Sequence, residues 1–140
     1  MLLIRPFERT DEATVVALWR DCGLVRPWND PHRDIARKLT VQPELFLVGT
    51  WHEQLVASAM AGFDGHRGWV YYLAVAAGRR RLSIGRQMMA KAESMLLERG
   101  CPKVNLLVRT SNTGVLAFYR KLGYAADEAV PLGKRLIHDQ

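Results

Sequence analysis

The chain reads Arg79-Arg80-Arg81-Leu82-Ser83-Ile84-Gly85-Arg86 between a strand-like run, 69–75, and a helix-like run, 84–99. The first N–H groups of a helix have no partners within the helix and lie at the positive end of its macrodipole, so they favour phosphate. The arginines add full positive charges. The segment therefore predicts a strand, a pyrophosphate-binding loop and a helix in succession.

Two familiar phosphate loops do not fit this segment. A Walker loop requires G-x-x-x-x-G-K-[S/T] and a Rossmann loop requires G-x-G-x-x-G, and the chain contains neither pattern. What remains is Arg80-x-x-Ser83-x-Gly85 at the start of a helix. It resembles the Q/R-x-x-G-x-G/A acetyl-CoA loop of the GCN5-related N-acetyltransferase (GNAT) superfamily, with Ser83 in place of the family's usual first glycine.

A second motif, downstream of the loop, supports the same resemblance. The chain carries Ser111-Asn112-x-x-Val115-x-x-Phe118-Tyr119-Arg120-Lys121-Leu122-Gly123-Tyr124, which is similar to the family's N-x-x-A-x-x-[F/Y]-Y-x-x-x-G-[F/Y]. Two motifs in the expected order are far more specific than one. Four more segments, 26–31, 64–68, 100–103 and 132–137, resemble one acetyltransferase subfamily, so the resemblance covers nearly all of the chain.

Composition and charge limit the classes of protein to consider. The 140 residues, 49% of them hydrophobic, predict one domain, 1–140, with a proper core. The net charge of +6 suits a small polyanion such as coenzyme A, because the basic residues are spread along the chain and their dense cluster is the loop. A nucleic-acid-binding domain is the weaker interpretation, since the aromatic RNP pattern and a G-x-x-G loop are missing.

The cysteines and the apolar runs carry further expectations. Cys22 and Cys101 lack C-x-x-C spacing and histidine partners, so we expect free thiols and no metal. Charged residues come too early for a signal peptide, and no run approaches the ~18 apolar residues of a membrane span. The sequence therefore predicts a cytoplasmic protein with no membrane or nucleic-acid partner.

Apolar periodicity and turn residues predict the remaining elements. Helices are expected from Thr10 or Asp11 to Gly23, from Asp30-Pro31, over 84–99, and from a Ser111 cap to Gly123. Strands are expected over 2–7, 45–50, 55–62, 69–75 and 103–108, with a final hairpin of 124–130 and 132–137. The pattern predicts an α/β GNAT fold, a single mixed, mostly antiparallel twisted sheet of six to seven strands with helices on both faces.

The resemblance implies where acetyl-CoA would bind. In this family two neighbouring strands, here 71–75 and 103–108, splay apart, and the pantetheine arm pairs with exposed backbone in the gap. We expect Gly85, which lacks a Cβ, to let the phosphate approach, and Asn112 to start a helix, steady the cofactor or both. The residues assigned to the cofactor are Leu73, Val75, Arg80, Arg81, Ser83, Ile84, Gly85, Arg86 and Asn112.

Tyr119 is the residue expected to take part in chemistry, because acyl transfer from a thioester yields a thiolate that a phenol can protonate or stabilise. The two places where relatives carry a glutamate base are Trp69 and Leu107 here, so no usual base is present. Turn and cap residues remain to relay a proton through water. The acceptor-site candidates are Trp28, Asn29, Asp30, Asp64, His66 and Tyr71.

The function implied is an acetyl-CoA-dependent N-acetyltransferase, in which a primary amine of a small molecule or a protein attacks the thioester directly in a ternary complex. No acyl-enzyme is expected, because neither cysteine lies near the motif positions. The alternative is a catalytically silent CoA-binding sensor, suggested by Ser83 and the missing carboxylates. The sequence leaves the acceptor and the oligomeric state open, a homodimer included.

Overall fold

A computed structural model describes residues 1–80 and 83–140 of the chain. The strands are β1 (Leu2–Pro6), β2 (Phe46–Trp51), β3 (Gln54–Phe63), β4 (Gly68–Val75) and β5 (Val104–Asn105). The α-helices are α1 (Glu12–Asp21), α2 (Pro31–Lys38), α3 (Ile84–Glu98) and α4 (Thr113–Lys121). Three short 3-10 turns, η1 (Arg9–Asp11), η2 (Pro43–Leu45) and η3 (Ala77–Arg79), connect them. Two loop residues, Arg81 and Leu82, lie outside the described residues.

The strands form one mixed sheet in which spatial order follows chain order, β1-β2-β3-β4-β5. The first three pairs are antiparallel, and β4 pairs with β5 in parallel. A parallel pair needs a crossover, which α3 supplies. The described part of the chain therefore holds five strands, and the expectation of six to seven strands is wrong.

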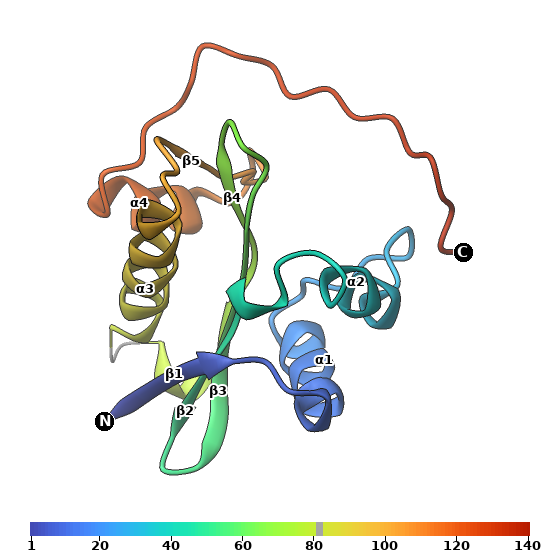
Figure 1. Cartoon of the computed structure of the whole chain (residues 1–140), viewed down its shortest axis with the longest axis vertical. Helices are drawn as coiled ribbons and strands as arrows, with labels where there is room; N and C mark the ends of the chain where they lie inside the picture. The colour runs from blue at the N-terminus through green and yellow to red at the C-terminus, as the bar shows by residue number, and fades with distance from the viewer. Residues whose placement is uncertain (81–82) are drawn as a thin grey trace.

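Helices cover both faces of the sheet, as expected (Figure 1). On one face, α3 and α4 pack over a core that includes the fully buried stripe Ile84, Met88, Ala92 and Leu96. On the other face, α1 and α2 cover a second core around Trp19, Ile35 and Phe46. Each helix buries one stripe at the 3.6-residue period, which explains why these elements could be predicted from the sequence.

The helix starts follow local capping chemistry. The Asp30 carboxylate accepts hydrogen bonds from the N–H groups of His32 and Arg33 at 2.9 and 3.3 Å, and Pro31 follows at the first helical position. The cap of α4 is Asn112, whose side chain accepts from the N–H of Val115 at 3.3 Å. Ser111, the expected cap, therefore lies one residue before it.

The expected final hairpin is also wrong, because residues 124–140 contain no strand. Figure 1 shows this segment leaving α4 and running to the side of the molecule where α2 lies. Val130, Leu132 and Leu136 are exposed along it. Apolar residues favour a strand locally, but a strand forms only where an edge accepts its hydrogen bonds, and the ion pairs of Asp139 hold the segment at α2 instead.

The structure contains, in the ranges it describes, no helix that is long and apolar enough to cross a membrane.

Candidate functional site

The parting of β4 from β5 is the main feature of the site. The two strands pair only through Gly68 with Val104 and Trp69 with Asn105. The N–H of Ala76 donates to the carbonyl of Val56 in β3 at 2.8 Å. Successive residues of a strand direct their N–H and C=O groups to opposite sides, so the backbone groups of Val75 point away from β3, toward the gap. On the edge that faces the gap, residues 71–75 have no paired strand among the described residues, which is the open backbone that the splayed-strand expectation requires.

The start of α3 meets the end of β4 and the side of α4 at Gly85. A Cβ built on Gly85 would lie 3.2 Å from the Phe118 ring and 3.7 Å from Cγ2 of Val75. The missing side chain thus admits Phe118, whereas we expected it to admit phosphate. The close approach brings the first N–H groups of α3, which have no partner within the helix, next to the open edge of β4.

Ser83 precedes α3 with backbone angles in the left-handed region, φ 57° and ψ 22°. This conformation is strained for every residue except glycine. The family's usual glycine at this position therefore has a conformational reason, and Ser83 keeps the conformation at a cost. Its hydroxyl accepts a hydrogen bond from Nε2 of Gln87 at 3.3 Å.

Arg80 folds back onto the end of β4. Its Nε donates to the carbonyl of Val75 at 3.2 Å, and its Nη2 lies 3.6 Å from Sγ of Cys22. The Cys22 thiol also donates to the Val75 carbonyl at 3.5 Å. The expectation that both cysteines lie away from the motif positions is therefore wrong for Cys22, which the C-terminal end of α1 brings to the loop. The Val75 carbonyl is occupied by these two donors.

The remaining loop residues divide between core and surface. The Ile84 side chain is fully buried, so only its backbone can serve a ligand, whereas Arg86 is exposed. Leu73 is half-buried beside the α3 core. Arg81, which we also assigned to the cofactor, is one of the two residues that the structure leaves undescribed.

A β-bulge interrupts β4 at Tyr72, in the middle of the open edge. Ser58 pairs with Ala74 and Met60 with Tyr71, so β4 contains one extra residue, and Tyr72 has φ 52°. The fully buried Ser58 hydroxyl donates to the Tyr72 carbonyl at 2.7 Å and accepts from Nε1 of Trp19 at 2.9 Å. Sequence reasoning missed Ser58, although a serine inside the apolar run 55–61 was the available signal.

Tyr119 is a buried aromatic residue of α4. Its ring packs edge-on against Phe118 and Tyr124, at centroid distances of 5.1 and 5.5 Å. No hydrogen bond to its hydroxyl is found within the described part of the chain. Burial raises the pKa of Tyr119 to about 12, so the phenol keeps its proton at physiological pH and can act as a hydrogen-bond donor.

A cavity of about 940 Å³ lies along this side of the sheet. It is bordered by the start of β4, by β5 and by α4, and Tyr119, Leu107 and Trp69 line it. The two positions that lack the usual glutamate base thus face the same space as Tyr119. Neither position carries a carboxylate that could replace the glutamate of the relatives.

The α1–α2 loop brings Trp28 and Asn29 to the far side of the gap. The Trp28 side chain is 42% exposed, and the guanidinium of Arg109, from the segment after β5, lies 5.8 Å from its ring centroid. Nη2 of Arg135 donates to Oδ1 of Asn29 at 2.8 Å. Three distant segments therefore meet around the expected acceptor loop.

Asp64 and His66 lie in the β3–β4 turn at the closed end of the strand pair, where Asp64 is beside Trp69, one of the residues that line the cavity of Tyr119. This end is about 20 Å along β4 from Val75 at the usual rise per residue. The N–H groups of Arg67 and His66 donate to the Asp64 carboxylate and lower its pKa. These hydrogen bonds give Asp64 a structural role in the turn. Tyr71, half-exposed and stacked on Trp69, lies between this turn and the bulge.

Asp34 is a second residue that sequence reasoning missed. Its Oδ2 accepts from the Tyr72 hydroxyl at 2.6 Å, and its Oδ1 pairs with Arg37 at 3.1 Å. Burial, followed by this hydrogen bond, raises the pKa of Tyr72. The pair joins α2 directly to the bulge in β4. No sequence signal marked it, because Asp34 reads as an ordinary exposed helix residue.

Comparisons with known proteins agree with this geometry. Residues 12–124 match the model of the Acetyltransferase (GNAT) family. The chain is 47% identical over 137 residues to an acetyltransferase of Yersinia enterocolitica, a match that covers 98% of this chain and 97% of that protein.

Two solved structures share the fold at low sequence identity. AAC(6')-Iy in complex with the bisubstrate analog CoA-S-monomethyl-acetylneamine superposes with a TM-score of 0.80 at 14% identity, over 98% of this chain and 99% of that chain. A protein of Clostridium acetobutylicum, described as a predicted acetyltransferase and crystallised with acetyl-CoA, gives a TM-score of 0.73 at 19% identity, over 95% and 96%.

Proposed function

Because this chain belongs to the acetyltransferase (GNAT) family, we propose that it transfers the acetyl group of acetyl-CoA to a primary amine, in a ternary complex and without an acyl-enzyme. The observation that carries the proposal is the open edge of β4, which leads from the bulge at Tyr72 to the start of α3. An extended amide chain can pair with that edge while its phosphates meet the first N–H groups of α3.

The residues present fit such a ligand. The first N–H groups of α3 have no partner within the helix, and Arg80 and Arg86 add positive charge beside them. Acetyl-CoA, when bound, supplies an activated thioester. The C. acetobutylicum neighbour was crystallised with acetyl-CoA and AAC(6')-Iy with a CoA bisubstrate analog, which supports the same ligand and direct transfer here.

Tyr119 is proposed as the donor to the departing sulfur. A thioester that loses its acyl group leaves a thiolate, and a protonated phenol within hydrogen-bond reach stabilises that charge. The raised pKa of Tyr119 favours hydrogen bonding over complete proton transfer. The acceptor amine loses its proton to solvent, since Trp69 and Leu107 occupy the places of the usual base.

The experiment is a titration of acetyl-CoA by calorimetry, followed by free-thiol release with a panel of amines. Binding with turnover supports the enzyme. Binding without turnover on any amine supports the second candidate, a silent CoA-binding sensor, which the strained Ser83 and the missing carboxylates favour. Absence of acetyl-CoA binding overturns both.

The pH profile of turnover then reports the class of amine. Without a dedicated base, kcat/KM rises with pH up to the pKa of the acceptor, about pH 10 for a lysine-like amine and about pH 8 for an α-amine. Asp64→Asn and His66→Gln should leave this rise unchanged if the amine loses its proton to solvent and not through water held by the β3–β4 turn. Asp30→Asn tests the cap residue in the same way. A profile that is flat from pH 6, and that one variant collapses, contradicts the proposal and identifies a base.

A further inference from the structure

An enclosed carboxylate lies against α2, on the face of the sheet that α1 and α2 cover. Asp139 accepts from Nη2 and Nη1 of Arg37 at 2.6 and 3.2 Å and from the backbone N–H of Asp30 at 3.1 Å. Nη1 of Arg33 lies 3.6 Å away. None of the Asp139 side chain is exposed, and the Arg37 hydrogen bonds, followed by the Asp30 N–H, lower its pKa to about 2.

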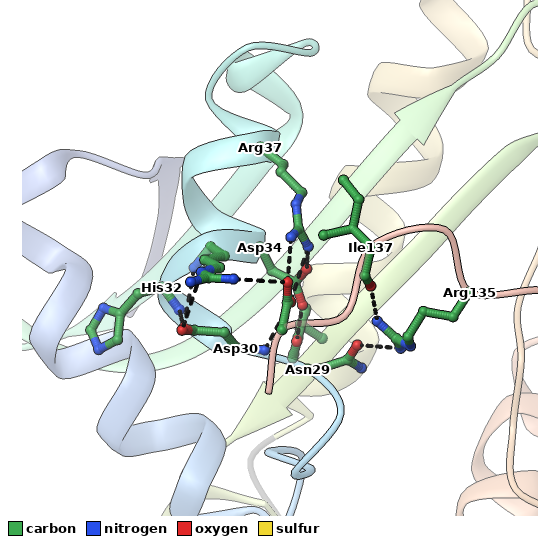
Figure 2. A network of polar contacts seen from close by, with 10 residues as sticks. Asn29, Asp30, His32, Asp34, Arg37, Arg135 and Ile137 are labelled. Carbon is green, nitrogen blue, oxygen red and sulfur yellow. Dashed lines mark hydrogen bonds and ion pairs between the residues drawn. The ribbon is translucent and has the colours of Figure 1, made fainter.

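Asp127, near the start of the C-terminal segment, pairs with Lys103 and Asn105, but the residues between Asp127 and Asp139 are held much less firmly. Among them, Val130, Leu132 and Leu136 are all more than 80% exposed. Figure 2 shows Arg135 reaching Asn29 and the carbonyl of Ile137, while Arg37 points from α2 toward the segment. The docking of the end of this segment at α2 therefore depends mainly on the Asp139 carboxylate.

This anion site is joined to the open edge of β4. Arg37 pairs with Asp34 at 3.1 Å (Figure 2). Asp34 in turn accepts from the Tyr72 hydroxyl at 2.6 Å. Tyr72 is the bulge residue, next to Leu73 on the proposed acetyl-CoA edge. Two side chains, those of Asp34 and Tyr72, therefore connect the anion site to the strand along which the thioester would lie. Asp30 and Asn29 belong to the expected acceptor loop.

We propose that Arg33, Arg37 and the N–H of Asp30 form a carboxylate subsite for the acceptor, which Asp139 occupies until the acceptor displaces it. A planar guanidinium recognises a carboxylate through two parallel hydrogen bonds, as Arg37 does with Asp139. The acceptor would then be an amine that also carries a carboxylate group. The claim that the bound carboxylate belongs to the acceptor rests on the proposed function, whereas the existence of the anion site does not.

The first test measures carboxylate binding without catalysis. Asp139→Ala should vacate the site, so calorimetry should show succinate binding to this variant at least about tenfold more tightly than to the unmodified protein. Asp127→Ala is the matched control, because it removes a carboxylate of the same C-terminal segment that pairs with Lys103 at 2.8 Å and not with α2. The double variant Asp139→Ala/Arg37→Lys keeps the positive charge at position 37 but cannot form the two parallel hydrogen bonds of a guanidinium. It should therefore lose the gain in succinate affinity.

Equal succinate affinity in the folded Asp139→Ala and Asp127→Ala variants, or a gain that survives Arg37→Lys, would overturn the subsite. Circular dichroism establishes that each variant is folded. These outcomes leave acetyl-CoA binding and thiol release untouched, so the failure of the subsite is distinguishable from the failure of the enzyme.

The second test measures how turnover depends on the length of the acceptor and on its carboxylate group. Thiol release is compared between ω-amino carboxylates from glycine to 6-aminohexanoate and n-alkylamines of matching length. Asp139→Ala should lower KM about tenfold for the best amino carboxylate and leave KM for its alkylamine twin unchanged, and Arg37→Lys should raise only the former. Equal effects on both series contradict the subsite. Absence of thiol release on every amine contradicts the proposed enzyme, and the succinate titration then decides the subsite alone.

Discussion

The hydroxyl of Ser58 donates a hydrogen bond to the carbonyl of Tyr72 at 2.7 Å and so holds the bulge of β4 from the neighbouring strand. The same hydroxyl accepts from the indole of Trp19. One small buried side chain thereby fixes the shape of the strand on which we place the thioester. Tyr72 adopts a left-handed backbone conformation that needs such support.

Replacing Ser58 should therefore affect both stability and activity. Ser58→Ala leaves the buried Trp19 N–H without an acceptor and should lower the free energy of unfolding by about 2 kcal/mol, with a fall in kcat/KM. Denaturant unfolding checks the first effect. In a Trp19→Phe background the cost should shrink, because the unsatisfied donor is gone. An equal cost in both backgrounds would show that the hydrogen bond is not the cause.

Gly85 should be constrained by Phe118. Gly85→Ala puts a methyl group 3.2 Å from the ring and should lower the free energy of unfolding by about 1–3 kcal/mol through overpacking. Phe118→Leu in the same chain should recover much of that loss. If the two substitutions are additive in denaturant unfolding, the contact does not explain the glycine.

Ser83→Gly should stabilise the protein. The left-handed conformation of Ser83 is free for glycine, so the substitution should raise the free energy of unfolding by roughly 1 kcal/mol and hold or improve acetyl-CoA affinity. Ser94→Gly, at an exposed position within α3, is the matched control and should instead destabilise by about 1 kcal/mol. A large loss of affinity in Ser83→Gly would show that the hydroxyl is a required contact.

Tyr119→Phe removes only the hydroxyl of the proposed donor. We expect kcat to fall by about 10²-fold with little change in acetyl-CoA affinity. Tyr124→Phe is the matched control, since its hydroxyl donates to Glu93 at 2.5 Å and its loss should affect stability more than turnover. Steady-state rates equal to those of the unmodified protein would make Tyr119 a core residue only.

Lys38 should make stability depend on pH above neutrality. Its ammonium group is buried against the carbonyl of Ala61, and burial lowers the pKa of Lys38 to about 8. Between pH 8 and the ordinary lysine pKa of about 10.4, the unfolded chain binds the extra proton, so the free energy of unfolding should rise with pH, by up to about 3 kcal/mol. Below pH 8 both states are protonated and the penalty is constant.

Denaturant titrations between about pH 7 and 9 measure this slope below the pH range in which tyrosines of the unfolded chain lose their protons. Lys38→Met should abolish it, and Lys91→Met, at an exposed position of α3, should not. A slope that persists in Lys38→Met assigns the titration to another group.

The elements that could be predicted from the sequence are those with local causes. The cap and proline at Asp30-Pro31 start α2, and the apolar stripe from Ile84 to Leu96 defines α3. The gap between β4 and β5 followed from family resemblance together with the loop. Each of these signals lies within a few residues of the element that it specifies.

The errors have non-local causes. The apolar residues of 124–137 read as a hairpin, yet a strand forms only where its backbone pairs with a neighbour, and the segment is instead held through the side chains of Asp127 and Asp139. The contact of Cys22 with Arg80 joins residues 58 positions apart. Nothing in the run 55–61 shows that Ser58 faces a bulge, because the extra residue belongs to the neighbouring strand.

Because β4 and β5 separate after two residue pairs, we expect the strands of the sheet to differ in how readily they unfold locally. The β2–β4 meander joins strands that are neighbours in the chain through short connections, residues 52–53 and 64–67, whereas β5 is attached by two residue pairs after a long crossover. The meander should form early in folding and exchange its amide protons slowly, and β5 should close last and exchange first. A ligand lying along β4 would then act as a missing strand and slow exchange at this weakest edge.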